Sequence, residues 1–159
     1  MSKILYIMNY LFPNKLKKVS GWVFYLTLPI GLYLFITDRF EELLIVSVPQ
    51  LFTDETIIGA QRESIWIENG FLDEILTALI IISGIINSFS KEKIEDELIS
   101  KLRTDSLTLS LYINYSLVIL ATFLFYEFLY FDVLVFNLFA ILLVFNLLFK
   151  IKLFNHYNS

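Results

Sequence analysis

Four long stretches of the sequence contain no charged residue, and they constrain the fold more than any other feature. They cover residues 19–37, 75–90, 106–126 and 133–149, and they are 19, 16, 21 and 17 residues long. The hydrocarbon core of a bilayer is about 30 Å thick, so a helix that rises about 1.5 Å per residue crosses it in about 20 residues. The stretches therefore predict four membrane-spanning helices, and the second must begin near Phe71 to be long enough.

A water-soluble four-helix bundle is the alternative interpretation of these stretches. Its helices would need a polar face opposite the apolar stripe. Between Val133 and Phe149 the polar residues are only Asn137 and Asn146, so a helix there is apolar all round. The composition agrees, because 57% of the 159 residues are hydrophobic and 18% are charged, whereas soluble domains have about 25% charged residues. We therefore expect an all-α polytopic membrane helix bundle, a single domain over residues 1–159.

The expected elements follow one another along this domain. They are a short N-terminal interfacial helix over 3–12, a first span over 20–37, an exterior loop over 38–70, a second span over 71–89, a cytoplasmic helix over 92–126 that continues into the third span, and a fourth span over 132–153. Within the loop, residues 64–68 alternate polar and apolar side chains, which predicts a strand.

The long helix is predicted from its ends and from the link that follows it. Residues 91–132 contain neither Gly nor Pro, and Ser90 stands at the position of an N-cap. The link between the third and fourth spans is very short. These two helices are therefore predicted to be antiparallel neighbours.

The distribution of Lys and Arg predicts the orientation. Ten of the 12 Lys and Arg residues fall in the N-terminal arm, the 91–105 segment and the C-terminal tail, whereas Arg39 and Arg62 lie in the 38–70 loop. Because positive loops stay on the cytoplasmic side, we expect an inner-membrane protein with both termini in the cytoplasm. Lys15, Lys17 and Lys18 suit contact with anionic membrane lipid.

The composition excludes several classes of protein. The chain has no Cys and a single His, so cysteine-ligated or histidine-rich metal sites and thiol catalysis are excluded. The net charge of −4 gives no support for nucleic-acid binding. No motif for phosphate or dinucleotide binding occurs. We therefore expect no cofactor, no metal site and no catalytic residue, and an enzyme is the least supported class.

Polar residues inside membrane spans are costly and are candidates for function. Asn87, Asn114 and Asn146 fall on the second, third and fourth spans, each in the inner half, with Tyr112 and Tyr115 nearby. They either hydrogen-bond between helices, which is the more common role of asparagine, or line a polar cavity.

The first turns of the 92–126 helix form an amphipathic surface. Its expected contact stripe and charged rim are Ile94, Leu98, Ile99, Leu102, Glu95, Glu97, Lys101 and Arg103. Such a surface suits a cytoplasmic protein partner or a second copy of the chain. It suits equally well packing on the protein's own N-terminal helix or on the membrane surface.

A series of short motifs, spread over most of the chain, occurs in a set order. They are Phe12-Pro-Asn-Lys15, Lys17-Lys18, Gly21-Trp22, Pro29, Val48-Pro-Gln-Leu-Phe52, Phe71-Leu-Asp-Glu-Ile75, Ser88-Phe-Ser-Lys-Glu-Lys93, Glu95-Asp-Glu97, Leu102-Arg103, Ser106-Leu107 and Asn114-Tyr115. Together they resemble an uncharacterised family of small four-span inner-membrane proteins of Bacteroidota. The resemblance implies a location and a topology, and it carries no activity or functional residue with it.

These observations favour a non-enzymatic multi-pass membrane protein with a partner-binding or regulatory role through residues 92–105. The first alternative is an oligomeric pore or channel lined by the three asparagines, including a membrane-permeabilising effector. The second is an intramembrane enzyme acting on lipid through Glu68, Asp73 and Glu74.

Overall fold

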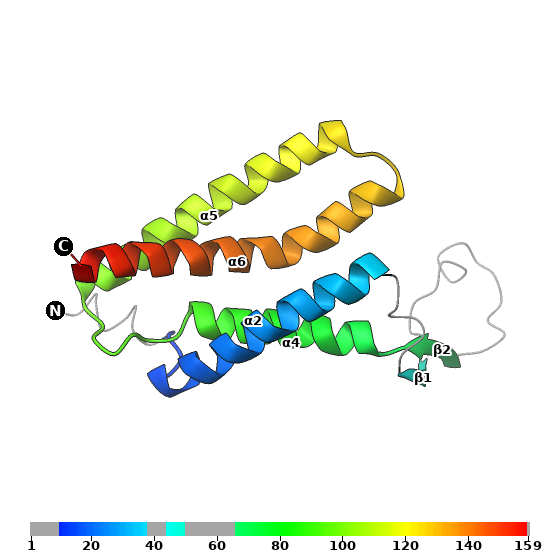
Figure 1. Cartoon of the computed structure of the whole chain (residues 1–159), viewed down its shortest axis with the longest axis horizontal. Coiled ribbons are helices and arrows are strands. Elements are labelled where there is room, and N and C mark those ends of the chain that lie inside the picture. Colours follow the sequence, from blue (N-terminus) through cyan, green and yellow to red (C-terminus); the bar gives the residue numbers. More distant parts are fainter. Residues whose placement is uncertain (1–9, 38–43, 50–65, 159) are drawn as a thin grey trace. The chain divides into compact units, whose positions relative to one another are not determined.

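A computed structural model provides the structure of the chain, and it describes residues 10–37, 44–49 and 66–158. The described elements are α2 (Asn14–Thr37), β1 (Ile45–Pro49), β2 (Trp66–Gly70), α4 (Leu72–Ser88), α5 (Glu97–Leu124) and α6 (Phe128–Asn158) (Figure 1). The chain divides into two compact units. The first unit contains residues 1–25 and 80–159, and the second contains residues 26–79.

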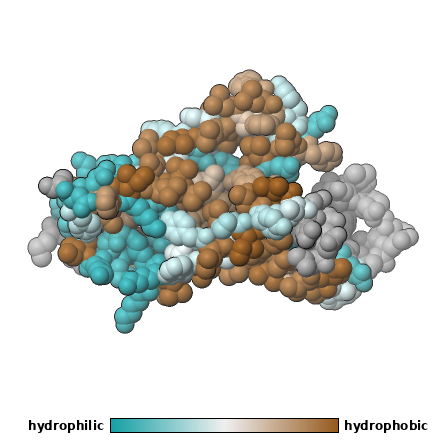
Figure 2. Space-filling view, viewed as in Figure 1, coloured by the Kyte–Doolittle hydropathy of each residue, from teal (hydrophilic) through white to brown (hydrophobic). Residues whose placement is uncertain are grey.

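Among the described residues, three helices are long and apolar enough to cross a membrane. They are α2, α5 and α6, with 24, 28 and 31 residues. Few of their apolar side chains are buried, and Figure 2 shows hydrophobic residues over much of the visible surface. Water would make this exposure unfavourable over so large an area, whereas lipid tails do not.

Helix α4 is the shortest of the four helices in the described part of the chain. Its 17 residues span about 26 Å, slightly less than the hydrocarbon core. The helix begins at Leu72, where Asp73 and Glu74 occupy the first turn and favour the positive end of the helix dipole. An element is therefore present where the second span is expected, and it is shorter than the other three.

The second unit contains a small antiparallel sheet. Strand β1 pairs with β2 in the register that places Ile45 opposite Gly70 and Pro49 opposite Trp66. The alternation at residues 64–68 therefore predicts a strand that the structure contains, at Trp66–Gly70. The 38–70 segment is therefore not a plain loop. The β-branched residues of β1 favour an extended backbone, and β2 pairs with it.

The start of α5 differs from the prediction. Residues 92–96 are not helical, and the N-cap is Asp96, whose Oδ1 accepts a hydrogen bond from the backbone N–H of Ile99 at 2.8 Å. Ser90 does not serve as an N-cap, because its backbone pairs with Phe12 in a parallel β-bridge and its hydroxyl donates to the carbonyl of Ile86. The predicted helix over 92–126 is therefore wrong at its first turns, and a non-helical α4–α5 linker, residues 89–96, takes their place.

The N-terminal prediction is also wrong where it can be examined. Most of the expected interfacial helix over 3–12 lies outside the described residues, and residues 10–12 are not helical. The N–H of Phe12 donates to the carbonyl of Phe89 at 2.8 Å, and the N–H of Lys91 donates to the carbonyl of Phe12 at 2.9 Å. A contact with a segment more than 70 residues away thus sets the local backbone.

Helices α5 and α6 form an antiparallel hairpin, as the short link predicts (Figure 1). The link turns at Glu127, whose φ of 57° is in the left-handed region. Helix α6 begins earlier and ends later than the expected 132–153 span, at Phe128 and Asn158. The apolar core of this hairpin consists of three buried residues, Ile99, Phe145 and Phe149. Leu102, Leu107 and Leu153 pack against them.

A glycine allows three helices of the first unit to approach closely. A Cβ atom added at Gly84 of α4 would lie 2.8 Å from the ring of Phe24 in α2 and 2.9 Å from a methyl group of Leu142 in α6. These distances are shorter than van der Waals contact, so a larger residue forces the helices apart. Helix α4 therefore packs against two of the helices that are long enough to span a membrane.

Candidate binding cavity

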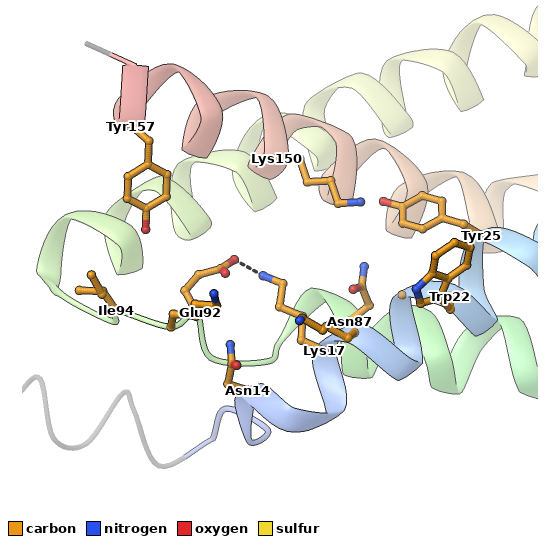
Figure 3. Close-up of a pocket in the computed structure, with 12 residues that line it drawn as sticks. Asn14, Lys17, Trp22, Tyr25, Asn87, Glu92, Ile94, Lys150 and Tyr157 are labelled. Atoms are coloured by element: carbon orange, nitrogen blue, oxygen red, sulfur yellow. Dashed lines mark hydrogen bonds and ion pairs between the residues drawn. The ribbon is translucent and has the colours of Figure 1, made fainter.

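The first unit contains an open cavity of about 690 Å³ between α2, the α4–α5 linker and α6 (Figure 3). Its charged lining is Lys17, Lys18, Lys93, Lys150 and one carboxylate, Glu92. The remaining lining residues are Asn14, Gly21, Trp22, Tyr25, Asn87, Ile94 and Tyr157. The volume falls within the range of small-molecule sites, about 300–1,000 Å³. The lining has four cationic groups and one anionic group.

An ion pair joins two walls of the cavity. The Lys17 ammonium of α2 donates to Glu92 Oε1 of the linker, and both side chains are largely buried, at 19% and 13% exposure. Burial lowers the pKa of Lys17 below the ordinary lysine value, and the hydrogen bond and charge of Glu92 oppose this shift. Glu92 therefore compensates a charge that is partly removed from water.

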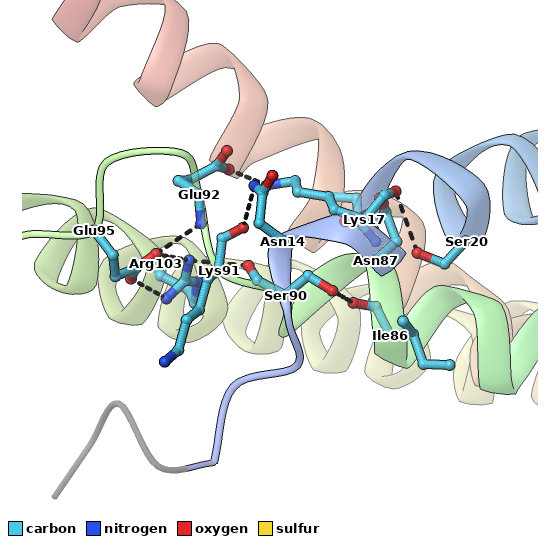
Figure 4. A network of polar contacts seen from close by, with 11 residues as sticks. Asn14, Lys17, Ser20, Ile86, Asn87, Ser90, Lys91, Glu92, Glu95 and Arg103 are labelled. Atoms are coloured by element: carbon cyan, nitrogen blue, oxygen red, sulfur yellow. Dashed lines mark hydrogen bonds and ion pairs between the residues drawn. The ribbon is translucent and has the colours of Figure 1, made fainter. Parts of the chain in front are cut away.

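The linker that carries Glu92 is attached to the N-terminal segment by further hydrogen bonds (Figure 4). Asn14 Nδ2 donates to the carbonyl of Lys91 at 2.7 Å, next to the backbone bridge between Phe12 and Ser90. The backbone N–H of Glu92 donates to Glu95 Oε2 at 2.8 Å. These bonds satisfy backbone groups that a helix would otherwise satisfy, so the non-helical linker has a defined conformation.

A buried ion pair lies behind the linker. Arg103 donates to both oxygens of Glu95, at 2.6 and 3.0 Å, and to the carbonyl of Ser90 at 3.3 Å. Its guanidinium lies 5.1 Å from the ring centroid of Phe149. Two parallel hydrogen bonds to one carboxylate fix the geometry of the pair. Arg103 thereby connects α5, the linker and α6.

The three predicted intramembrane asparagines have different environments, although all are buried. Asn87 Nδ2 donates to Asn146 Oδ1 at 2.8 Å, and Asn146 Nδ2 donates to the hydroxyl of Ser88 at 2.8 Å. Asn114 Oδ1 has no hydrogen-bond partner among the described residues. The structure thus brings two of the three together as an interhelical contact and leaves the third apart. Tyr112 and Tyr115 are exposed.

The predicted partner-binding stripe is divided by the structure. Ile99 is 1% exposed, and Leu102 packs on the same apolar core. Arg103 and Glu95 form the buried pair, and Ile94 lies in the linker rather than on the helix. Of the eight residues, those that are exposed are Ile94, Leu98, Glu97 and Lys101. The residues do not form one continuous surface, because the stripe packs on α6.

Sequence reasoning missed the cavity itself. Lys17 and Lys18 were expected to contact anionic lipid, and both line it, whereas Lys15 does not. Lys93, Lys150 and Tyr157 were used only for orientation or not at all. The available signal was that Lys18 and Lys150 directly border charge-free stretches, which places them at the ends of helices.

The arrangement suits an anion rather than a metal ion. In the described ranges, no group of three or more His, Asp or Glu side chains lies close enough together to hold a metal. Lysine ammonium groups with amide and hydroxyl donors beside them favour phosphate or carboxylate ligands.

Comparison of the chain with protein-family models, curated proteins and solved structures finds no match.

Proposed function

We propose that the chain is a four-span inner-membrane protein, with both termini in the cytoplasm, that binds the headgroup of an anionic lipid in the basic cavity. The observation that carries the proposal is the convergence of four lysines from α2, the linker and α6 on a cavity with a single carboxylate. Basic pockets between membrane helices on the cytoplasmic side bind lipid headgroups through the same chemistry.

The proposed topology rests on packing and on charge. Helix α4 contacts α2 and α6 at Gly84, which supports α4 as the fourth span despite its length. The cavity lysines belong to the segments that hold ten of the 12 Lys and Arg residues, and Figure 2 shows hydrophilic residues gathered at the end of the first unit where α6 ends. The positive-inside rule puts this end in the cytoplasm. The family resemblance of the sequence implies the same topology.

The chemistry of the lining supports a lipid headgroup. Trp22 and Tyr157 are exposed aromatic residues beside exposed lysines. Trp and Tyr favour the depth of the lipid headgroups, and lysines near it attract anionic lipids with about 1 kcal/mol each. A headgroup that contacts lysines of three segments would also hold those segments together.

The geometry favours lipid binding over the expected partner-binding role and over a pore. Ile99, Leu102 and Arg103 are engaged inside the unit, so a protein partner would meet only part of the predicted stripe. Asn87 and Asn146 bind each other between helices, and of the three asparagines only Asn87 lines the cavity, so the three do not line one channel together. We propose binding and no catalytic step.

Lipid binding can be tested on protein purified in mild detergent. Native mass spectrometry would measure binding of dioleoyl phosphatidic acid and dioleoyl phosphatidylcholine to the wild type and to a triple variant with Lys18→Gln, Lys93→Gln and Lys150→Gln. We expect the wild type to prefer the anionic lipid and the triple variant to bind it about tenfold more weakly or worse.

The matched control removes three lysines that do not line the cavity, through Lys15→Gln, Lys101→Gln and Lys152→Gln. Both triple variants lose the same net charge, so long-range attraction falls equally. Equal loss of binding in the two variants would contradict a cavity site.

The topology can be tested because the chain has no cysteine. Variants with a single cysteine at Ser2 or at Ser64 would be treated, in intact cells, with a thiol reagent that does not cross the membrane. We expect labelling at position 64 and not at position 2, and the reverse pattern would contradict the proposed orientation.

A further inference from the structure

We infer that the cavity selects a headgroup that ends in a phosphomonoester, with a charge near −2, over a phosphodiester with a charge of −1. The inference rests on the proposed lipid binding and specifies the ligand class of that same site. A phosphomonoester carries a charge of about −1.5 to −2 at pH 7 and three acceptor oxygens.

The first argument is the charge balance of the lining. Lys17 is already compensated by Glu92. Among the described residues, Lys18, Lys93 and Lys150 have no carboxylate within ion-pair distance. Three uncompensated cations therefore face one ligand, and a headgroup with a single negative charge would leave most of this charge unbalanced.

The second argument is the number of donors. Lys18, Lys93 and Lys150 belong to three separate segments, so a ligand that contacts all three benefits from acceptor oxygens that point in several directions. A phosphomonoester offers three terminal oxygens, whereas a phosphodiester offers two. The ligand with more terminal oxygens matches the spread of the lysines better.

The third argument is a donor that lacks an acceptor. The Tyr25 hydroxyl is buried and has no hydrogen-bond partner among the described residues. The Lys150 ammonium lies over the Tyr25 ring, 4.2 Å from its centroid, and both side chains line the cavity (Figure 3). Buried polar groups are rarely unpaired in native structures. A phosphate group that draws the Lys150 ammonium off the ring would uncover the hydroxyl and supply the missing acceptor.

Glu92 gives this selectivity a distinct test. Its carboxylate repels an anionic ligand and holds Lys17 at the same time. Glu92→Gln removes the repulsion and keeps an oxygen that accepts from Lys17. We expect the variant to bind phosphomonoester lipid more tightly than the wild type does. A zwitterionic headgroup would behave oppositely, because its ammonium group would pair with Glu92.

The experiment compares lipids with identical acyl chains in the same detergent. Native mass spectrometry would measure binding of dioleoyl phosphatidic acid, dioleoyl phosphatidylglycerol and dioleoyl phosphatidylethanolamine to the wild type, the cavity triple variant and the control triple variant. We expect phosphatidic acid to bind about tenfold more tightly than phosphatidylglycerol. This preference should disappear in the cavity variant and persist in the control.

The outcomes separate this inference from the proposed function. Equal binding of phosphatidic acid and phosphatidylglycerol, both lost in the cavity variant, would overturn the phosphomonoester selectivity and leave lipid binding intact. Tight phosphatidylethanolamine binding that Glu92→Gln weakens would also overturn the selectivity. Inorganic phosphate that displaces phosphatidic acid at a similar concentration would support the phosphomonoester chemistry and overturn the lipid as its source. If the wild type binds none of the anionic lipids, both the phosphomonoester selectivity and the proposed lipid binding are overturned.

Discussion

Lys17 of α2 and Glu92 of the α4–α5 linker form an ion pair between residues 75 positions apart in the sequence. Lys17 also lies 5.2 Å from the ring centroid of Phe149 in α6. The pair therefore connects the N-terminal helix, the linker and the C-terminal helix of the first unit. Because the side chains are largely buried, losing one partner costs more than losing an exposed ion pair.

The first prediction concerns the removal of one member of this pair. Lys17→Met leaves the Glu92 carboxylate without its cation, and we expect it to lower the free energy of unfolding by about 2 kcal/mol. Thermal unfolding of the detergent-solubilised protein, followed by circular dichroism, measures the change. Lys15→Met, at an exposed position that does not line the cavity, should change it by less than about 0.5 kcal/mol.

A double variant shows whether the loss comes from the pair. Lys17→Met combined with Glu92→Gln should be less destabilising than the sum of the single changes, because no unpaired charge remains. Additive effects would mean that the two side chains act independently.

The second prediction is a pH dependence that belongs to Lys17. Burial lowers the pKa of Lys17 in the folded chain below the ordinary value of 10.5, so at alkaline pH the unfolded chain binds more protons than the folded chain. The free energy of unfolding therefore rises with pH between the lowered pKa and the ordinary one. At pH values below the lowered pKa, the full cost of burying the Lys17 charge is present. Denaturation of the wild type and Lys17→Gln between pH 7 and pH 10.5 tests this. We expect the stability difference to shift in favour of the wild type as pH rises, and a shift the other way would contradict a lowered pKa.

The third prediction concerns the bidentate pair of Arg103 and Glu95. Arg103→Lys keeps the charge but cannot donate to both carboxylate oxygens in parallel. We expect a loss of about 1–2 kcal/mol, and about 3 kcal/mol for Arg103→Met, because Glu95 is then buried without a partner. Hydrogen exchange should increase at the linker amides, above all at Glu92, whose N–H binds Glu95. Lys101→Met, exposed on the same helix, is the control and should leave this protection unchanged.

The sequence carried enough information to locate the long helices, because hydropathy and charge-free length are local properties. It also predicted the α5–α6 hairpin, because the expected spans end at residue 126 and begin again at 132. The link in the structure, between Leu124 and Phe128, is shorter still. The strand at Trp66–Gly70 was visible in its alternation. Each of these follows from residues that are close together in the chain.

The linker and the cavity depend on contacts between distant residues. Ser90 was a reasonable N-cap by residue type, but its backbone pairs with Phe12, and Asp96 caps α5 instead. The cavity combines residues from Asn14 to Tyr157, and its formation depends on how the helices are rotated about their axes. The lysines at the helix ends could be predicted, and their convergence could not.

The fourth prediction uses the close approach at Gly84. Gly→Ala in a helix interior usually stabilises by about 0.5–1 kcal/mol. At Gly84 the new Cβ would lie within 3.0 Å of the buried Phe24 ring, so we expect Gly84→Ala to destabilise by about 1–2 kcal/mol. At Gly21 the nearest atom is the terminal Oδ1 of Asn87, at 3.0 Å. Gly21→Ala should therefore be the milder change in a thermal unfolding assay, and the opposite order would contradict the helix packing.

The fifth prediction compares two buried asparagines that the sequence did not distinguish. Asn146 binds Asn87 and Ser88, so Asn146→Leu leaves the buried Asn87 amide without its acceptor. We expect a loss of about 1–3 kcal/mol. Asn114 Oδ1 has no partner among the described residues, so Asn114→Leu removes an unsatisfied polar group and should be neutral or stabilising. Denaturation midpoints of the two variants in the same detergent measure the difference. A larger destabilisation by Asn114→Leu than by Asn146→Leu would mean that Asn114 has a polar partner outside the described contacts. The interpretation of the Asn87–Asn146 contact as the main interhelical hydrogen bond would then be wrong.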